Sequence, residues 1–178
     1  YKRQRCKSEN GTSTAEERAI VDSAFATPDE PVQKPAVLNN WDYSEDKDEM
    51  TGKKSYFAVC TSDNKIDFEF PYSGGSHFSL VVRKSATYGR DVYLKVSSGQ
   101  FLTSYDGKNM RVKFDDENPV NYSYTGATDG SADVIFIGSY SKFLNKLKKA
   151  KRVSLEPEFY QAGRQIVNFS VDGLKWDH

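Results

Sequence analysis

The sequence predicts a mainly β domain, an antiparallel β-sandwich or barrel-like fold with one amphipathic helix. From Tyr56 onward, short runs of alternating apolar residues are separated by turns rich in Gly, Asp, Asn and Ser. One segment breaks this pattern: Tyr140, Phe143, Leu144 and Leu147 recur at the spacing of a helix face. Strands do not alternate regularly with helices, so a doubly wound sheet is not expected.

The chain divides into a tail and a domain. Residues 1–40 are expected to be a linker or tail, because they are weakly apolar and contain a proline-rich stretch over 27–35. A short helix over 14–25 is the element expected there, with Glu16 and Glu17 at capping-box spacing. Residues 41–178 form the predicted sandwich-like domain, which is long enough to bury a core. The acidic stretch 42–49 is expected to be a solvated loop.

The first half of the domain is predicted to form hairpin-connected strands. A strand is expected over 56–61, and a turn at Asp63-Asn64 follows it. Apolar residues then alternate with polar ones in three further runs, which are Ile66, Phe68, Phe70; Phe78, Leu80, Val82; and Val92, Leu94, Val96. A short strand over 100–103 comes next.

The second half continues the pattern around the helix. Asp106-Gly107 is a hairpin signal before the strand at 110–114. The run 134–137 is apolar on both faces, which is typical of a central buried strand. The helix is expected over about 139–150, capped by Ser139 or Ser141. Later strands are expected over 152–155 and 167–171, and Leu174 and Trp176 are expected to anchor the end of the chain in the core.

Composition excludes some functions. The chain has 25 basic and 25 acidic residues, and this zero net charge argues against a nucleic-acid binder that relies on attraction to phosphates. Its two cysteines, Cys6 and Cys60, are too few for a disulfide scaffold or a zinc site. Cys60 is expected to be a small buried residue of a strand, and a Cys6–Cys60 bridge stays open. No cofactor and no metal ion are expected.

Catalytic signals are weak. The two histidines are His77, expected in a surface loop, and the terminal His178. A hydrolase that uses His77 is therefore the least favoured class, since a triad needs a histidine base. The carboxylates of 115–117 have the residue type for Ca²⁺ but match no EF-hand spacing, so a polar turn is expected.

Five residues are the candidates for binding. Arg83, Asp115 and Arg152 each flank a strongly alternating strand, and we expect them to lie together on the polar side of the sheet. Lys148 and Lys149 belong to the densest positive segment of the chain, 148–152, which offers a surface for an anionic partner; a solvated face is the simpler interpretation.

The first residues suggest a membrane nearby. Residues 1–7 (YKRQRCK) are basic, as is common for segments that flank a membrane helix. We therefore expect the chain to be tethered to a membrane by a preceding segment, with the side of the membrane open. The alternative is a solvated tail.

Several motifs of the domain occur together. They are Ser62-Asp63-Asn64, Phe68-Glu69-Phe70-Pro71-Tyr72, Leu80-x-x-Arg83, Asp91-Val92-Tyr93-Leu94, Gly99-Gln100-Phe101, Val112-x-Phe114-Asp115-Asp116 and Phe169-x-Val171-x-Gly173-Leu174-x-Trp176. This set resembles a family of small uncharacterised bacterial and prophage envelope-associated proteins, which often carry a lipoprotein signal or a membrane helix. It is more distantly similar to the TagO-like accessory proteins of type VI secretion. The resemblance covers 41–176 and implies a β module of the cell envelope without assigned chemistry. Cysteines that these proteins often carry near the Gly-Gln-Phe strand are replaced here by Leu102 and by residues 108–111.

These observations favour a non-enzymatic binding or interaction module of a membrane-anchored, lipoprotein-like bacterial envelope protein. Its expected partner is another protein or an envelope component rather than nucleic acid, and the oligomeric state stays open. The alternative is a β-sandwich that binds a small ligand or a carbohydrate.

Overall fold

The computed structural model describes residues 40–178 of the chain. The expected helix over 14–25, the basic stub and Cys6 lie outside this part, so the predictions about them stay predictions. Within the described part, Trp41 is buried and opens the first strand.

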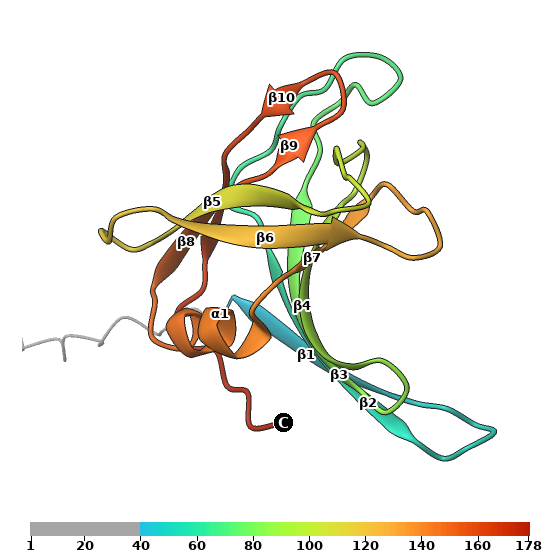
Figure 1. The fold of residues 1–178 in the computed structure, drawn as a ribbon. Coiled ribbons are helices and arrows are strands. Elements are labelled where there is room, and N and C mark those ends of the chain that lie inside the picture. The colour runs from blue at the N-terminus through green and yellow to red at the C-terminus, as the bar shows by residue number, and fades with distance from the viewer. Residues whose placement is uncertain (1–39) are drawn as a thin grey trace, which may run out of the picture. The chain divides into compact units, whose positions relative to one another are not determined.

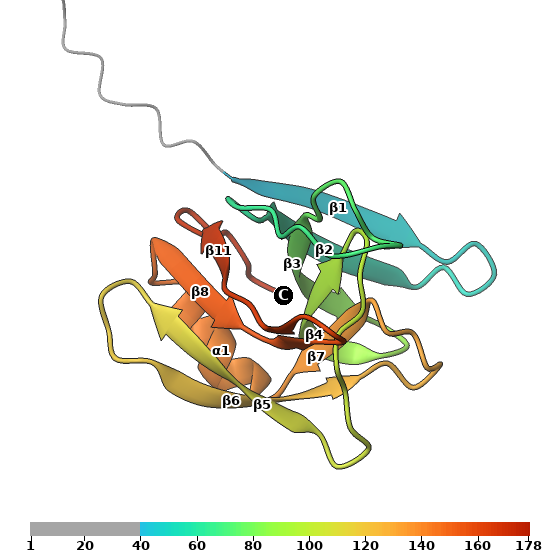
Figure 2. The same ribbon diagram turned by 90° about the horizontal axis from the view of Figure 1, so that it is seen from above.

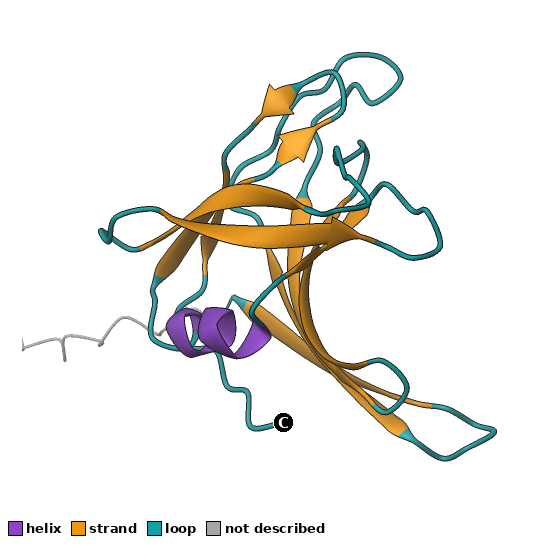
Figure 3. Cartoon of the chain, in the orientation of Figure 1, coloured by secondary structure: helices purple, strands orange, loops and turns teal. Residues whose placement is uncertain are grey.

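Nine strands form one antiparallel sheet in the order β1-β2-β3-β4-β7-β6-β5-β8-β11, and β9 and β10 pair separately (Figures 1 and 3). The first strands are β1 (Trp41–Lys47), β2 (Lys54–Thr61), β3 (Phe78–Ser85), β4 (Gly89–Val96), β5 (Lys108–Phe114) and β6 (Val120–Gly126). The later elements are β7 (Val134–Ile137), α1 (Tyr140–Leu147), β8 (Arg152–Glu156), β9 (Glu158–Phe159), β10 (Gly163–Arg164) and β11 (Val167–Ser170). The predicted mainly β, antiparallel class with one helix is confirmed.

The large sheet curls around its core without closing into a barrel. Figure 2 shows β1–β3 on one side and β5, β6 and β8 on the other, and the edge strands are β1 and β11. Hydrogen bonds outside the strand ladders connect the two ends. The indole N–H of Trp41 donates to the carbonyl of Val171 (2.9 Å), and the backbone amide of Asp63 donates to the backbone carbonyl of Asn168 (2.8 Å). These bonds hold the curled sheet around its core.

Regular alternation explains the strands that were predicted correctly. Val92, Leu94 and Val96 of β4 are all buried, while the residues between them are not. The same pattern holds in β5, where every second side chain faces the core. Cys60 is buried in β2 as expected, and burial raises the pKa of its thiol to about 12.

The helix covers one end of the core. Phe143, Leu144 and Leu147 are buried, and the ring of Phe143 packs edge-on against Phe114 and Tyr122, with centroid distances of 5.4 and 5.3 Å. The helix follows Ser139, whose side chain makes no capping hydrogen bond, so the expected hydroxyl cap is not formed there. Within residues 40–178, no helix has the length and apolar character that crossing a membrane requires.

Three local predictions were wrong. The acidic stretch 42–49 is not simply a loop, because most of it forms β1, paired with β2 from Trp41↔Cys60 to Lys47↔Lys54. The run 66–70 forms no strand; only Ile66 makes a bridge, with Ser76. The expected strand over 100–103 is likewise reduced to a bridge between Phe101 and Phe159.

Candidate functional site

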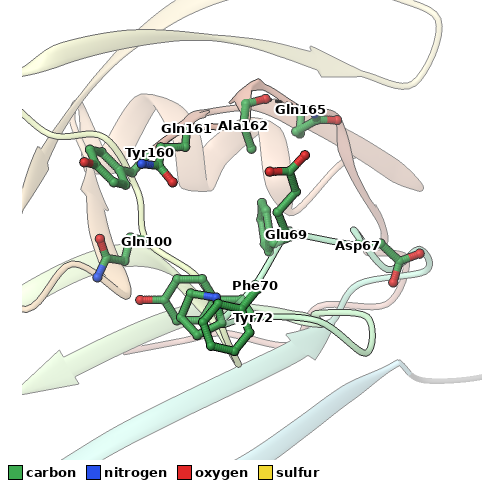
Figure 4. Close-up of a pocket in the computed structure, with 11 residues that line it drawn as sticks. Asp67, Glu69, Phe70, Tyr72, Gln100, Tyr160, Gln161, Ala162 and Gln165 are labelled. Atoms are coloured by element: carbon green, nitrogen blue, oxygen red, sulfur yellow. Dashed lines mark hydrogen bonds between the residues drawn. The ribbon is translucent and has the colours of Figure 1, made fainter.

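An open cleft lies beside the β9–β10 hairpin, which Figure 1 shows at the top of the domain. One wall is the loop 67–72, the other is the hairpin segment 160–162 with Gln165, and Gln100 lies at one end (Figure 4). We call it the hairpin cleft. Its volume of about 340 Å³ is within the range of small-ligand pockets.

The cleft is built on a packed aromatic cluster. The ring of Phe68 lines the cleft and contacts Phe159 below it, with centroids 5.0 Å apart. Phe159 in turn packs against Phe101 (4.9 Å) and Phe78 (5.6 Å). All four rings are buried. Because these rings are packed against one another in the core, the base of the cleft is expected to be rigid.

Backbone hydrogen bonds hold both walls in place. In the hairpin wall, the backbone amide of Tyr160 donates to the backbone carbonyl of Gln100 (2.9 Å). The backbone amide of Leu102 donates to the backbone carbonyl of Glu158 (2.8 Å). In the loop wall, the amide of Tyr72 donates to the carbonyl of Glu69 (3.0 Å). The cleft is therefore preformed by backbone contacts, which leaves its side chains free for a ligand.

Four polar side chains of the lining make no hydrogen bond or ion pair with any residue in 40–178. They are Asp67, Glu69, Gln100 and Gln161, and all are exposed. Figure 4 shows Glu69 and Gln100 on opposite sides of the open space. Polar groups that their own protein leaves unpaired around a concavity are available for a ligand.

Two aromatic side chains at the cleft are unusually exposed. Phe70 is 89% exposed and Tyr160 is 55% exposed, while Tyr72 is half-buried beside Phe70. Large apolar side chains that gather on one surface mark interaction sites more often than isolated ones do. Here they gather at a hollow that also holds the unpaired amides and carboxylates.

The charge of the lining is one-sided. It contains the carboxylates Asp67 and Glu69 and no lysine or arginine. A phosphate or carboxylate ligand would meet repulsion without a compensating cation, because such groups are recognised by Arg, Lys or helix N-termini. The cleft thus suits ligands without negative charge.

Two of the sequence-predicted residues come together elsewhere. The carboxylate of Asp115 accepts hydrogen bonds from the backbone amides of Lys151 (2.9 Å) and Arg152 (2.8 Å). Asp115 has φ 46°, and its own amide donates to the carbonyl of Arg152 (3.0 Å). Asp115 thus has a structural task, which is to fix the turn that enters β8.

Arg83 lies apart from these two. It forms a two-pronged ion pair with Asp91 on the neighbouring strand, at 3.0 and 2.6 Å. Its guanidinium also lies over the rings of Tyr88, Tyr93 and Phe136, at 5.1, 5.3 and 5.8 Å from their centroids. Strands β4, β7 and β6 separate its strand from β5, which precedes Asp115. The structure therefore brings Asp115 and Arg152 together without Arg83.

The remaining candidates are exposed. Lys148 and Lys149 follow α1 and form no ion pair with a described residue, whereas Lys146 pairs with Glu117. His77 is exposed, and its side chain makes no hydrogen bond or ion pair with a described residue. Over residues 40–178, no three His, Cys, Asp or Glu side chains gather as a metal site would need. Binding roles for Arg83, Asp115, Arg152, Lys148 and Lys149 stay predictions.

Sequence reasoning missed the residues of the hairpin cleft. The alternation of Ile66, Phe68 and Phe70 was noticed, but it was interpreted as a strand. The segment 160–165 has no apolar alternation, so no strand pattern pointed to it. The signal that could have found the cleft is a pair of aromatic residues, Phe70 and Tyr160, each next to turn-forming or polar neighbours.

Comparison with known proteins adds no assignment. No protein-family model, curated protein or solved structure matches this chain. The likeness to bacterial envelope-associated proteins therefore stays an expectation that depends on the motifs quoted above, and the function is inferred from the geometry of the hairpin cleft.

Proposed function

We propose that this domain is a non-enzymatic binding module whose hairpin cleft holds a small polar ligand without negative charge. The observation that carries the proposal is the coincidence of unpaired polar side chains and exposed aromatic rings in one preformed hollow. This favours the small-ligand alternative over a purely structural role.

The composition of the lining supports binding rather than catalysis. It contains no Ser, Thr, Cys, Lys or His, so its carboxylates and the hydroxyls of Tyr72 and Tyr160 are the only groups in the lining of a kind that can act as covalent nucleophiles. Its carboxylates, Asp67 and Glu69, are exposed and hydrogen-bonded to no described residue. A general acid or base is normally held in place by neighbouring groups, which here are missing.

The expected setting remains part of the proposal. The motifs shared with bacterial envelope-associated proteins and the basic segment 1–7 support a module tethered to a membrane, with the cleft presented to an envelope component. A test of the tether is to express the natural gene in full and to ask whether its product sediments with membranes. Recovery in the soluble fraction without any membrane-bound form would reject it.

The binding proposal is tested by nitrogen-15 NMR of the full 178-residue chain. Three probe mixtures are added separately: neutral oligosaccharides, uncharged short peptides, and nucleotides with sugar phosphates. We expect an uncharged probe to shift the amide signals of the loop 67–72 and of the hairpin segment 160–165, and the anionic mixture to leave them unchanged. Binding by the anionic mixture alone, or no shift at the cleft with any mixture, would overturn the proposal.

A further inference from the structure

We infer that the ligand of the hairpin cleft is a saccharide built from neutral or amine-bearing sugar units. This inference rests on the proposed function above and adds the chemical class of the ligand. It is carried by three features of the lining, which are its aromatic faces, its mixture of hydrogen-bonding groups and its charge.

The aromatic faces suit the C–H surface of a sugar ring. Phe70 carries no polar atom, so an 89% exposed ring at this position serves no hydrogen bond and offers only an apolar face. Tyr160 on the other wall offers a second face with a hydroxyl at its tip. A pyranose has one apolar face and polar edges, and a cleft with a ring on each wall matches that division.

The polar groups suit hydroxyls. A sugar hydroxyl both donates and accepts, so its best partners include both carboxylates and side-chain amides. The carboxylates of Asp67 and Glu69 accept only, while the amides of Gln100 and Gln161 do both. Gln165 is also in the lining, and its amide nitrogen is already engaged by the carbonyl of Ala162 at 2.9 Å. The free amides are therefore Gln100 and Gln161.

The charge of the lining narrows the class of sugar. Two carboxylates without a lysine or arginine disfavour uronic acids, sugar phosphates and nucleotides. The same carboxylates tolerate hydroxyls, acetamido groups and amines, and an ammonium group gains from them. The class is therefore neutral or amine-bearing rather than acidic.

A peptide is the main competing ligand. Backbone bonding in the hairpin wall disfavours its binding by strand addition. Peptides that add a strand to a sheet need free backbone donors and acceptors. In the hairpin wall, the amide of Tyr160 already donates to the carbonyl of Gln100 and is not open to a peptide strand. The unpaired side chains of Gln100 and Gln161, by contrast, are available to sugar hydroxyls.

The test is a binding experiment with the full chain and defined oligosaccharides. The probes are a tetramer of N-acetylglucosamine, a glucose tetramer, a glucosamine tetramer and, as the acidic counterpart, a galacturonic acid tetramer. We expect binding of at least one of the first three by saturation-transfer NMR and calorimetry, and no binding of the acidic tetramer. Addition of salt should weaken the binding of the amine-bearing tetramer more than that of the neutral ones.

Matched variants locate the binding site. Tyr160→Ala and Phe70→Ala should each weaken binding up to about tenfold, since an aromatic contact contributes roughly 0.5–1.5 kcal/mol. The control is Tyr105→Ala, because Tyr105 is fully exposed and does not line the cleft. All three variants should keep the melting temperature of the wild type, as their rings are exposed.

The outcomes separate the two levels of the proposal. Loss of saccharide binding in Tyr160→Ala but not in Tyr105→Ala supports the inference. Binding of a peptide at the cleft without any saccharide overturns the saccharide class and leaves the binding module standing. Preference for the galacturonic acid tetramer, or saccharide binding that no cleft variant weakens, also overturns the inference. If no probe binds at the cleft, both the proposed binding module and the saccharide inference are overturned.

Discussion

The backbone of Gly99 packs against the ring of Phe68 so closely that a Cβ atom on the glycine would lie 2.8 Å from Cε2 of the ring. Gly99 also has φ +140°, a conformation that side-chain-bearing residues rarely adopt. Because Phe68 lines the hairpin cleft, the turn that contains Gly99 packs directly against a residue of the site. A change at Gly99 therefore tests the link between core packing and the site.

We expect Gly99→Ala to destabilise the domain and to weaken binding at the hairpin cleft. Overpacking costs about 1–3 kcal/mol, and the unfavourable φ adds to it. The measurement is the free energy of unfolding by denaturant. The matched control is Gly74→Ala, because Gly74 has a similar φ of +112° but no atom within 4 Å of a new Cβ. Equal losses in the two variants would show that the contact with Phe68 is irrelevant.

The fold class was predictable because half-buried strands alternate. The buried side chains Val92, Leu94 and Val96 read directly as one face of β4. Strand β1 was not predicted. It is an edge strand that is exposed on both faces after Trp41, so its sequence carries no alternation. Its existence depends on pairing with β2, a partner that local pattern cannot reveal.

The two tryptophans provide a second prediction. Trp176 is 2% exposed, so the expected anchoring of the chain end in the core is confirmed. We expect Trp176→Ala to lower the free energy of unfolding by about 3–5 kcal/mol. Its indole N–H has no hydrogen-bond partner among the described residues, whereas that of Trp41 donates to Val171.

Substitution by phenylalanine should therefore separate the two positions. Trp41→Phe loses a hydrogen bond and Trp176→Phe does not, so we expect the first to cost about 1 kcal/mol more than the second. Chemical denaturation of both variants measures the difference. A larger cost for Trp176→Phe would contradict this account of the two indoles.

A pH dependence follows from Glu156. Two hydrogen bonds from the guanidinium of Arg111, at 2.5 and 2.6 Å, hold the pKa of this carboxyl below its usual value. Because the pKa of Glu156 is lower in the folded than in the unfolded chain, its ionised form stabilises the fold at pH values above the unfolded pKa of about 4.3. This stabilisation is lost as the pH falls through the folded pKa. Glu156→Gln should therefore be less stable than the wild type at pH 7, and the difference should shrink toward pH 3.

Urea unfolding at a series of pH values measures this difference. The control is Glu49→Gln, an exposed glutamate in the turn after β1 that forms no ion pair with a described residue. Its difference from the wild type should stay small across the same range. A constant difference for Glu156→Gln would mean that the ion pair does not distinguish the folded from the unfolded chain.

The candidate site was less predictable than the fold, for a physical reason. Asp115 and Arg152 were expected to be neighbours and are, because strands β5 and β8 pair and their ends meet. The hairpin cleft, by contrast, is made by segments far apart in sequence that lack regular pattern. Of the alternating residues Ile66, Phe68 and Phe70, the first two are buried as a strand pattern predicts, but their side chains enter the core from a loop.

The last prediction concerns Arg83 and Asp91, and it decides between a structural and a binding role for Arg83. Both side chains of the pair are only 18% exposed, and Arg83 also lies over three aromatic rings. Arg83→Lys keeps the charge but loses the planar fork, so we expect it to destabilise the domain by about 1–3 kcal/mol.

A double-mutant cycle with Arg83→Ala and Asp91→Ala measures the interaction itself. We expect a clear coupling energy for this pair and little for the exposed pair Lys54–Glu45, because solvent screens the second pair. Arg83→Lys should leave binding at the hairpin cleft unchanged once the protein is folded, since Arg83 is not part of its lining. Full stability of Arg83→Lys together with lost ligand binding would reverse the assignment and restore Arg83 as a binding residue.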